Sequence, residues 1–283
     1  MTDAPIANAA QITYWNEVAP ATWTAFQARL DALFEPLTQN AIDAAAPAAG
    51  ETVFDIGCGC GATVLELARR VGPAGHVLGL DVSEPMAAKA RERIASEALA
   101  QAEIVVSDAS KYAFEPTGAD LLFSRFGVMF FDDPTGAFAH MRTAMRPAGR
   151  MLFACWRTLS ENPWFGLPLQ AARPLLPPQP PPDPNAPGPF AFADPDSVRP
   201  ILTEAGWRDI DLRRQDTPMQ LGALNIAIDF ALRMGPLAAI LREADDNALR
   251  ERVREVVAQT FGARSAADGI SLPGSVWLVS ARP

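Results

Sequence analysis

Short apolar runs alternate with helical patterns along the middle of the chain. Five mostly apolar runs predict β-strands, and they cover residues 52–57, 76–82, 103–108, 119–124 and 149–156. Between most of them the apolar residues recur at helical spacing, as in the segment from Val64 to Val71. Short apolar strands that alternate with helices predict an α/β protein whose mostly parallel sheet is covered by helices on both faces.

The segments on either side of this alternation extend the prediction. Apolar side chains at helical spacing predict a helix over 22–45, kinked or split at Pro36, and the stretch 145–150, MRPAGR, predicts a helix end followed by a turn. The later pattern predicts a helix over 194–205, a strand over 207–212, a mainly helical block over 221–261 and a final strand over 275–281.

These elements add up to seven strands, preceded by helices. We therefore expect an N-terminal helical lid over residues 1–48 and a domain over 49–283 with insertions after strands five and six, at about 157–193 and 218–270. The proline-rich stretch 173–190 predicts an extended loop within the first insertion.

Composition narrows the classes of partner. The 283 residues carry a formal net charge of −9, which disfavours a surface that neutralises phosphates, so we expect no nucleic-acid partner. The three cysteines, Cys58, Cys60 and Cys155, fit neither a disulfide nor a zinc site, so we expect a reducing compartment, the cytoplasm, and no metal. No basic leader and no apolar run long enough to span a membrane is visible, so we expect no membrane partner.

The stretch VFDIGCGCGATVLELA, residues 53–68, predicts a strand, a glycine turn and a helix. Gly57, Gly59 and Ala62 satisfy the G-x-G-x-x-G/A pattern of dinucleotide-binding folds, and Asp81 lies where such folds place a ribose-binding acid. Asp55, two residues before the first glycine, argues against a pyrophosphate, which favours positive potential and free amides at this point. A cationic ligand suits this carboxylate better.

S-adenosylmethionine (SAM) carries an ammonium group, a sulfonium and a ribose but no phosphate. The stretch DIGCGCG, together with the acids Asp81 and Asp108 at the ends of the next two strands, resembles the motifs of the class I SAM-dependent methyltransferases. The likeness covers about residues 51–156 and the closing strand, and the branch it resembles is that of small-molecule enzymes similar to the ubiquinone and menaquinone C-methyltransferases. The resemblance implies a Rossmann-like fold and SAM as the cofactor.

The same resemblance implies a role for each acid. Asp55 would lie near the methionine amine, Asp81 would accept both ribose hydroxyls, Met86 would pack on the adenine face, and Asp108 with Ala109 would contact the adenine edge. A simpler interpretation stays open for two of them, because Asp108 and Asp81 can also cap the turn and the helix that follow them.

Further cofactor contacts are expected around these acids. The backbone of the glycine turn would approach the ligand closely, the backbone of Ser124 would lie beside the methionine part, and aromatic faces before the first strand would contact the sulfonium, unless they pack as ordinary amphipathic residues. This second group of expected cofactor contacts is Tyr14, Trp23, Gly57, Cys58, Gly59, Gly61, Val82 and Ser124.

The sequence says less about which residues would bind the methyl acceptor. Phe126, Met129, Trp156 and Trp164 are candidates for an apolar substrate chamber, with packing beneath a helix as the alternative for the residues that follow strand four. Arg125, at the tip of strand four, is a candidate to hold a substrate carboxylate or phenolate, or to pair with one of the acids at 132 and 133.

Methyl transfer from a sulfonium needs alignment more than a strong base, and neither of the two histidines is well placed as one, so we assign no catalytic residue. The proposed reaction is transfer of the SAM methyl group to a small, partly apolar metabolite. The alternatives are an NAD(P)-dependent oxidoreductase, a SAM-binding protein without chemistry, and a SAM enzyme that promotes cyclisation. The methylated atom stays open, as does the choice between monomer and homodimer.

Overall fold

The computed structural model describes residues 8–179, 183 and 186–283. The chain forms two compact units. The first consists of residues 1–156, 185–215 and 276–283, and the second of residues 157–184 and 216–275. The second unit and the predicted insertions both begin at residue 157, but residues 185–193 belong to the first unit. The predicted division into a lid over 1–48 and a domain over 49–283 with two insertions stays a prediction.

A seven-stranded sheet organises the first unit. Its strands are β1 (Thr52–Ile56), β2 (His76–Asp81), β3 (Ala102–Val106), β4 (Ala119–Arg125), β5 (Met145–Trp156), β6 (Arg208–Gly222) and β7 (Ile270–Arg282), in the order β3-β2-β1-β4-β5-β7-β6. The neighbours from β3 to β5 are parallel, and β7 is antiparallel to β5. The expected mostly parallel, Rossmann-like sheet is confirmed.

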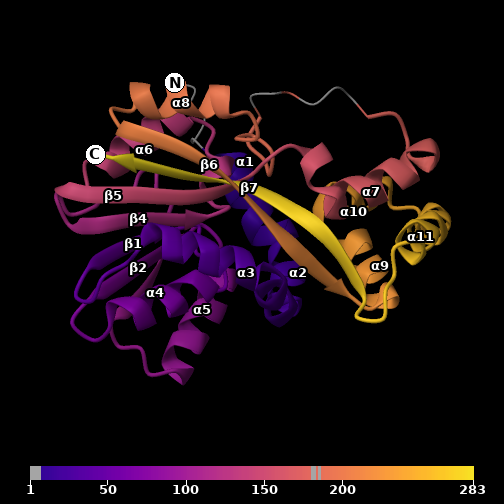
Figure 1. Ribbon diagram of the computed structural model, residues 1–283, viewed down its shortest axis with the longest axis horizontal. Coiled ribbons are helices and arrows are strands. Elements are labelled where there is room, and N and C mark those ends of the chain that lie inside the picture. Colours follow the sequence, from indigo (N-terminus) through magenta and orange to yellow (C-terminus); the bar gives the residue numbers. More distant parts are fainter. Residues whose placement is uncertain (1–7, 180–182, 184–185) are drawn as a thin grey trace, which may run out of the picture. The chain divides into compact units, whose positions relative to one another are not determined.

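Helices cover this sheet on both faces. Those of the first unit are α1 (Ala9–Thr13), the π-helix η1 (Tyr14–Val18), α2 (Pro20–Ala25), α3 (Gln27–Ala45), α4 (Ala62–Val71), α5 (Glu84–Ser96), the 3-10 turn η2 (Val128–Phe130), α6 (Pro134–Arg142) and α8 (Pro195–Glu204). Figure 1 shows α4 and α5 on one side of β1 and β2, and α6 with α8 on the other side of the sheet. The apolar face of α4, from Val64 to Val71, is buried as its spacing predicts.

The second unit is mainly helical. Its elements are the 3-10 turn η3 (Leu159–Glu161), α7 (Pro163–Ala172), the 3-10 turn η4 (Arg173–Leu175), α9 (Leu224–Arg233), α10 (Gly235–Ala244) and α11 (Asn247–Gly262), together with parts of β6 and β7. In the predicted loop 173–190, residues 180–182 and 184–185 lie outside the described residues. Among the described helices, none alone is long and apolar enough to cross a membrane, and α9 and α10, bent by 61°, meet the length and composition criteria only as a pair.

Several predicted boundaries were wrong. The N-terminal helix does not break at Pro36, which lies inside α3, but at Phe26, whose φ of −97° and ψ of +9° leave the helical region. The stretch 145–150 is not a turn after a helix but the irregular start of β5, since Ala119 pairs with Met145 while Leu121 pairs with Arg150. β6 continues ten residues beyond the predicted end at 212, and residues 217, 219 and 221 alternate inward along it. β7 begins at 270 rather than 275.

The parallel register sets the position of the site. Asp55 of β1 lies level with Gly79 of β2 and Phe123 of β4, and Asp81 lies level with Val106 of β3. The carboxyl ends of β1 to β4 therefore share one edge of the sheet, the edge at which open α/β folds bind ligands.

Candidate functional site

The glycine turn after β1 has a backbone that only glycine adopts without strain. Gly57, Gly59 and Gly61 have φ angles of +70°, +55° and +84°. A Cβ atom at Gly57 would lie 2.6 Å from Cα of Gly127, the glycine that follows β4. The ends of β1 and β4 therefore approach each other at Gly57 and Gly127. This close approach already excludes a side chain at position 57.

Asp55 lies under this turn and is fully buried. Its Oδ2 accepts a hydrogen bond from the Thr63 hydroxyl in the first turn of α4, whereas its Oδ1 is buried without a hydrogen-bond partner. Burial raises the pKa of Asp55 to about 7, and the Thr63 hydrogen bond and the charge of Arg125 oppose this rise. A buried carboxylate oxygen without a partner is costly, so this geometry suits a ligand that donates a hydrogen bond, as an ammonium group does.

Asp81 ends β2 and organises the backbone around it. Its Oδ2 accepts a hydrogen bond from the Gly59 amide at 2.7 Å, and its Oδ1 accepts one from the Ser83 amide at 2.8 Å. Burial also raises the pKa of this carboxyl group. Asp81 thus holds both the glycine turn and the residues that lead into α5, while each oxygen keeps a second lone pair for a ligand. The ribose contact stays a prediction.

The predicted adenine contacts lie on both sides of Asp81. Met86 on α5 is buried, and its Cε lies 3.0 Å from where a Cβ atom of Gly59 would be. Asp108, after β3, caps its own turn, because its Oδ1 accepts hydrogen bonds from the amide (2.9 Å) and hydroxyl (2.8 Å) of Ser110. Ala109 is buried beside it. These hydrogen bonds fit the capping interpretation, and the adenine contacts of Asp108 and Ala109 stay predictions.

Two asparagines that sequence analysis missed tie the N-terminal helices to this edge. The Asn8 side chain donates to Asp108 Oδ2 at 2.9 Å, and Asn8 and Asp132 exchange a reciprocal pair of hydrogen bonds at 2.6 and 2.7 Å. Asn16 donates to the Val82 carbonyl at 2.9 Å and accepts from the Glu84 amide at 3.1 Å. The N-terminal helical segment thus contacts the loops after β2, β3 and β4. No periodic pattern in the sequence marks these two residues.

The aromatic residues of the N-terminal helices form a cluster. Tyr14 and Trp23, the expected sulfonium contacts, each pack edge-on against Trp15, with ring centroids 5.4 and 5.6 Å apart. Trp15 also packs against Phe130 of η2 at 5.2 Å. Because Trp15 lies at the centre of this cluster, mutual packing accounts for the contacts seen, and a sulfonium contact stays a prediction.

At the tip of β4, Arg125 pairs with neither Asp132 nor Asp133. Asp132 is bonded to Asn8, and Asp133 caps α6 by accepting from the Gly136 amide at 2.9 Å. Arg125 instead donates to the Thr38 hydroxyl at 2.6 Å. The alternative in which Arg125 pairs with one of these acids was therefore wrong, because both acids accept hydrogen bonds from backbone amides and Arg125 donates to Thr38.

The other residues at this tip are packed tightly. Ser124 donates to the Ile56 carbonyl at 2.7 Å, which joins β4 to β1. Phe126 has a φ of +68°, a strained conformation for a bulky side chain, and its ring stacks on Trp156 at the end of β5, with centroids 4.1 Å apart. Met129 in η2 is 1% exposed. These side chains supply apolar surface at the edge of the sheet.

Trp164, the remaining substrate candidate, belongs to the second unit. It is buried on α7, where its ring stacks on Phe165 with centroids 3.5 Å apart and its indole nitrogen donates to the Asn162 side chain at 3.3 Å. Its role in a substrate pocket stays a prediction.

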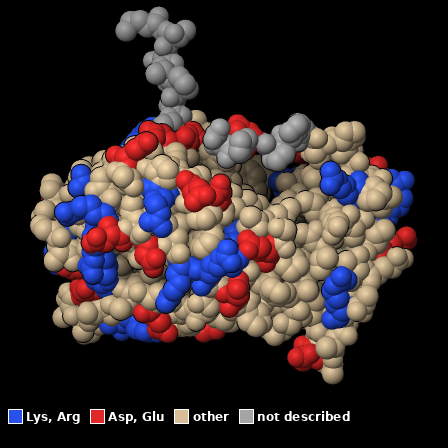
Figure 2. Space-filling view, turned by 45° about the horizontal axis from the view of Figure 1, so that its top comes forward, with Lys and Arg blue, Asp and Glu red and all other residues tan. Residues whose placement is uncertain are grey.

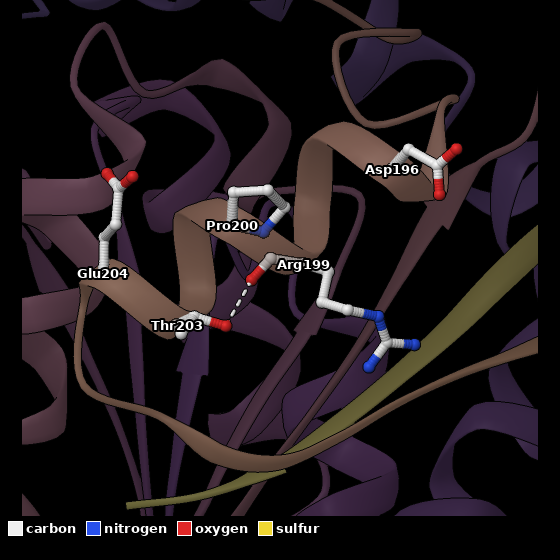
Figure 3. Close-up of a pocket in the computed structure, with 5 residues that line it drawn as sticks. All are labelled: Asp196, Arg199, Pro200, Thr203 and Glu204. Carbon is white, nitrogen blue, oxygen red and sulfur yellow. Dashed lines mark hydrogen bonds between the residues drawn. The ribbon is translucent and has the colours of Figure 1, made fainter.

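A surface pocket of about 410 Å³ lies elsewhere, on α8 (Figure 3). It is lined by Asp196, Arg199, Pro200, Thr203 and Glu204. Figure 3 shows the acidic side chains and the arginine pointing apart, with a single hydrogen bond drawn, from the Thr203 hydroxyl to the Arg199 carbonyl. No group of convergent side chains marks this pocket as a reaction site.

Comparison with known proteins finds a similarity over the part of the chain that contains this edge. Residues 53–149 match the family model described as a methyltransferase domain, and this segment contains the glycine turn and all three acids. This segment of the chain is therefore similar to a methyltransferase domain, and it forms the parallel part of the Rossmann-like sheet.

Particular relatives share part of the chain. Aklanonic acid methyltransferase DauC of Streptomyces sp. (strain C5) is 33% identical over 120 residues, which are 42% of this chain and 54% of that protein. Nocamycin O-methyltransferase of Saccharothrix syringae is 30% identical over 118 residues, 42% of each protein. The match thus spans about half the length of these relatives or less.

A solved structure extends the fold comparison. Haemonchus contortus phosphoethanolamine N-methyltransferase 2, in complex with SAM, superposes with a TM-score of 0.58 at 17% identity, over 96% of this chain and 59% of that one. At this identity the likeness concerns the fold alone.

Proposed function

We propose that this chain is a SAM-dependent methyltransferase that acts on a small, partly apolar metabolite. The observation that carries the proposal is the arrangement at the carboxyl edge of β1 to β3, where a glycine turn with positive φ angles lies between two buried carboxylates. Asp81 holds this turn, and Asp55 lies beneath it with one oxygen unpartnered. This edge offers negative charge rather than the free amides that a pyrophosphate needs, which argues against a nicotinamide cofactor.

The residues present fit SAM. Asp55 would receive the ammonium group, Asp81 the ribose hydroxyls, and Met86 with Ala109 the adenine. SAM supplies the methyl group of its sulfonium. The chain's part is to align the acceptor with that methyl group and to exclude water, and the N-terminal helices held by Asn8 and Asn16 serve the second purpose.

The acceptor is expected to be small and partly apolar. Phe126, Met129 and Trp156 supply buried apolar surface beside the predicted cofactor site, and the names of the two relatives describe methyl transfer to small organic molecules, in one case to oxygen. The face drawn in Figure 2 intermingles acidic and basic side chains, which supports a small-molecule partner rather than nucleic acid. The three free thiols support a cytoplasmic location, and we propose a monomer or homodimer.

Calorimetric titration tests the cofactor class without knowledge of the acceptor. The purified chain is titrated in parallel with SAM, S-adenosylhomocysteine and NADH. We expect binding of the first two and not of NADH. The Asp81→Asn variant should bind S-adenosylhomocysteine more weakly by about 1–3 kcal/mol, through loss of charge-assisted hydrogen bonds. The Asp43→Asn variant, which removes an exposed carboxylate from α3, serves as the control.

The outcomes separate the alternatives. Binding of NADH alone would refute the proposal and assign the turn to a pyrophosphate. If SAM binds, candidate acceptors are screened by product mass, since methylation adds the mass of one methyl group. A product of unchanged mass would indicate cyclisation chemistry instead.

A further inference from the structure

We propose that Arg125 binds the carboxylate of the amino-acid part of SAM, so that Asp55 and Arg125 together receive the two charged groups of that part. This inference rests on the proposed function. It moves Arg125 from the acceptor side, where its place in the sequence suggested a role, to the cofactor side.

The two side chains come from adjacent strand ends. β1 and β4 are parallel neighbours, with Asp55 level with Phe123, two residues before Arg125. The Arg125 side chain extends toward α3, where Nη1 donates to the Thr38 hydroxyl at 2.6 Å and the guanidinium lies 5.4 Å from the centre of the Phe34 ring. Asp55 and Arg125 are close enough to influence each other's ionisation, yet they form no ion pair.

Each of the two carries an unmet hydrogen-bonding atom. Nε of Arg125 is buried without a partner, as is Oδ1 of Asp55. Such atoms are rare in folded proteins because each one costs desolvation that nothing offsets. Here the two have opposite charge and lie at neighbouring strand ends. An α-amino acid, with its ammonium and carboxylate on one carbon, complements this pair.

The free edge of the guanidinium has the geometry that a carboxylate prefers. Nη1 is engaged by Thr38, which leaves Nε and Nη2 on the side that can form two parallel hydrogen bonds to one carboxylate. Asp31 of α3, whose charge also acts on Arg125, is already engaged. It accepts hydrogen bonds from Arg93 at 2.7 Å and from Gln27 at 2.6 Å.

The surroundings keep the pair out of water. Phe34 packs edge-on against Phe126 at 5.6 Å, and the Phe126 ring stacks on Trp156. Burial lowers the pKa of Arg125, while the charges of Asp31 and Asp55 oppose that shift. A charge-assisted hydrogen bond is strengthened in such low-dielectric surroundings, which is why a carboxylate ligand gains from this position.

Two ligands that differ only in the carboxylate test the proposal. Calorimetry measures the affinity of the wild-type chain, Arg125→Gln and Arg125→Lys for SAM and for decarboxylated SAM. We expect Arg125→Gln to lower the affinity for SAM about 10- to 100-fold, the range of a lost charged hydrogen bond. Its affinity for decarboxylated SAM should stay within about twofold of wild type, because the lost partner is absent from that ligand. Arg125→Lys should lie between, since it keeps the charge and loses the paired donors.

The control is Arg146→Gln. Arg146 is exposed and pairs with Asp120 at 2.5 Å near the amino end of β4, so its removal changes the net charge equally at the opposite edge of the sheet. We expect both affinities to be unchanged in this variant. Retained binding of decarboxylated SAM also shows that each variant has a folded nucleoside site.

Three results would overturn the inference. Equal SAM affinity in wild type and Arg125→Gln would mean that this arginine serves the acceptor or the core. Equal loss of affinity for both ligands would mean that it only supports the fold. Absence of SAM binding by the wild-type chain would instead refute the proposed function on which the inference rests.

Discussion

The raised pKa of Asp55 predicts how the free energy of unfolding changes with pH. The carboxyl group is fully buried, and burial raises its pKa from 3.8 to about 7 in the folded chain. Because the folded state holds a proton that the unfolded state has released, folding takes up protons between these two values. The contribution of Asp55 to stability is then fully present below pH 3.8 and is lost as the pH rises toward 7 and above.

The magnitude follows from the shift. Each pKa unit corresponds to about 1.4 kcal/mol, so the total loss across the window is about 4 kcal/mol, of which about 2.5 kcal/mol falls between pH 5 and pH 8. Asp55→Asn removes the titrating group while preserving its shape. We therefore expect the stability advantage of the wild type over this variant to shrink by about 2.5 kcal/mol between these two pH values.

Two measurements check this expectation. Urea unfolding of wild type and Asp55→Asn over pH 5–8 gives the difference in stability, with the exposed Asp43→Asn as the control for removal of a charge. Proton release on unfolding at pH 5.5 gives a second readout, in which wild type should release about one proton more than Asp55→Asn. A pH-independent difference, with equal proton release, would refute the assignment of a raised pKa to this carboxyl group.

Three further changes have definite outcomes. Gly57→Ala should lower the free energy of unfolding by about 3 kcal/mol or more, because a Cβ there meets backbone at 2.6 Å. Gly50→Ala, also at positive φ but with open space around its Cβ, should cost about 1 kcal/mol in urea unfolding. Equal costs in the two variants would contradict the close approach at Gly57. Thr63→Val should raise the pKa of Asp55 further, because it removes the hydrogen bond that lowers it, and an unshifted proton-release profile would refute this. Asn8→Ala should speed amide hydrogen exchange in α1 and η1 about tenfold while α11 is unaffected; unchanged exchange would show that other contacts hold the lid.

The sequence predicted the sheet well because its strands are apolar and locally patterned. β1, β2 and β4 are nearly continuous apolar runs, which is how strands buried on both faces appear. The prediction failed where the outcome depended on distant contacts. β6 looked short because the four residues after its predicted end, 213–216, are polar and mostly exposed, and the inward alternation begins only at Thr217. Pro36 was expected to kink or split its helix, but α3 is not split there and continues through it, with Phe34 and Leu37 buried on either side.

At the site, too, local features were predictable from the sequence and distant contacts were not. Positions at strand ends could be inferred, because parallel strands bring their carboxyl ends to one edge. Hydrogen-bond partners could not, since they join residues far apart in the chain. Asn8 and Asp108 are 100 positions apart, and Arg125 and Thr38 are 87 apart. No periodicity relates such pairs, so the lid contacts and the true partner of Arg125 emerged only from the structure.

The buried charges at this edge make sense only together. A fully buried carboxylate with one unpartnered oxygen, and a guanidinium with an unpartnered Nε, both cost stability in the free chain. Placing well-packed apolar residues at 55 and 125 would avoid that cost. The chain instead surrounds the pair with structure that is itself demanding, including three glycines at positive φ and the strained backbone of Phe126. Strain and unmet polar groups gathered at one edge of a sheet are the expected features of a site shaped for a charged ligand rather than for the stability of the fold.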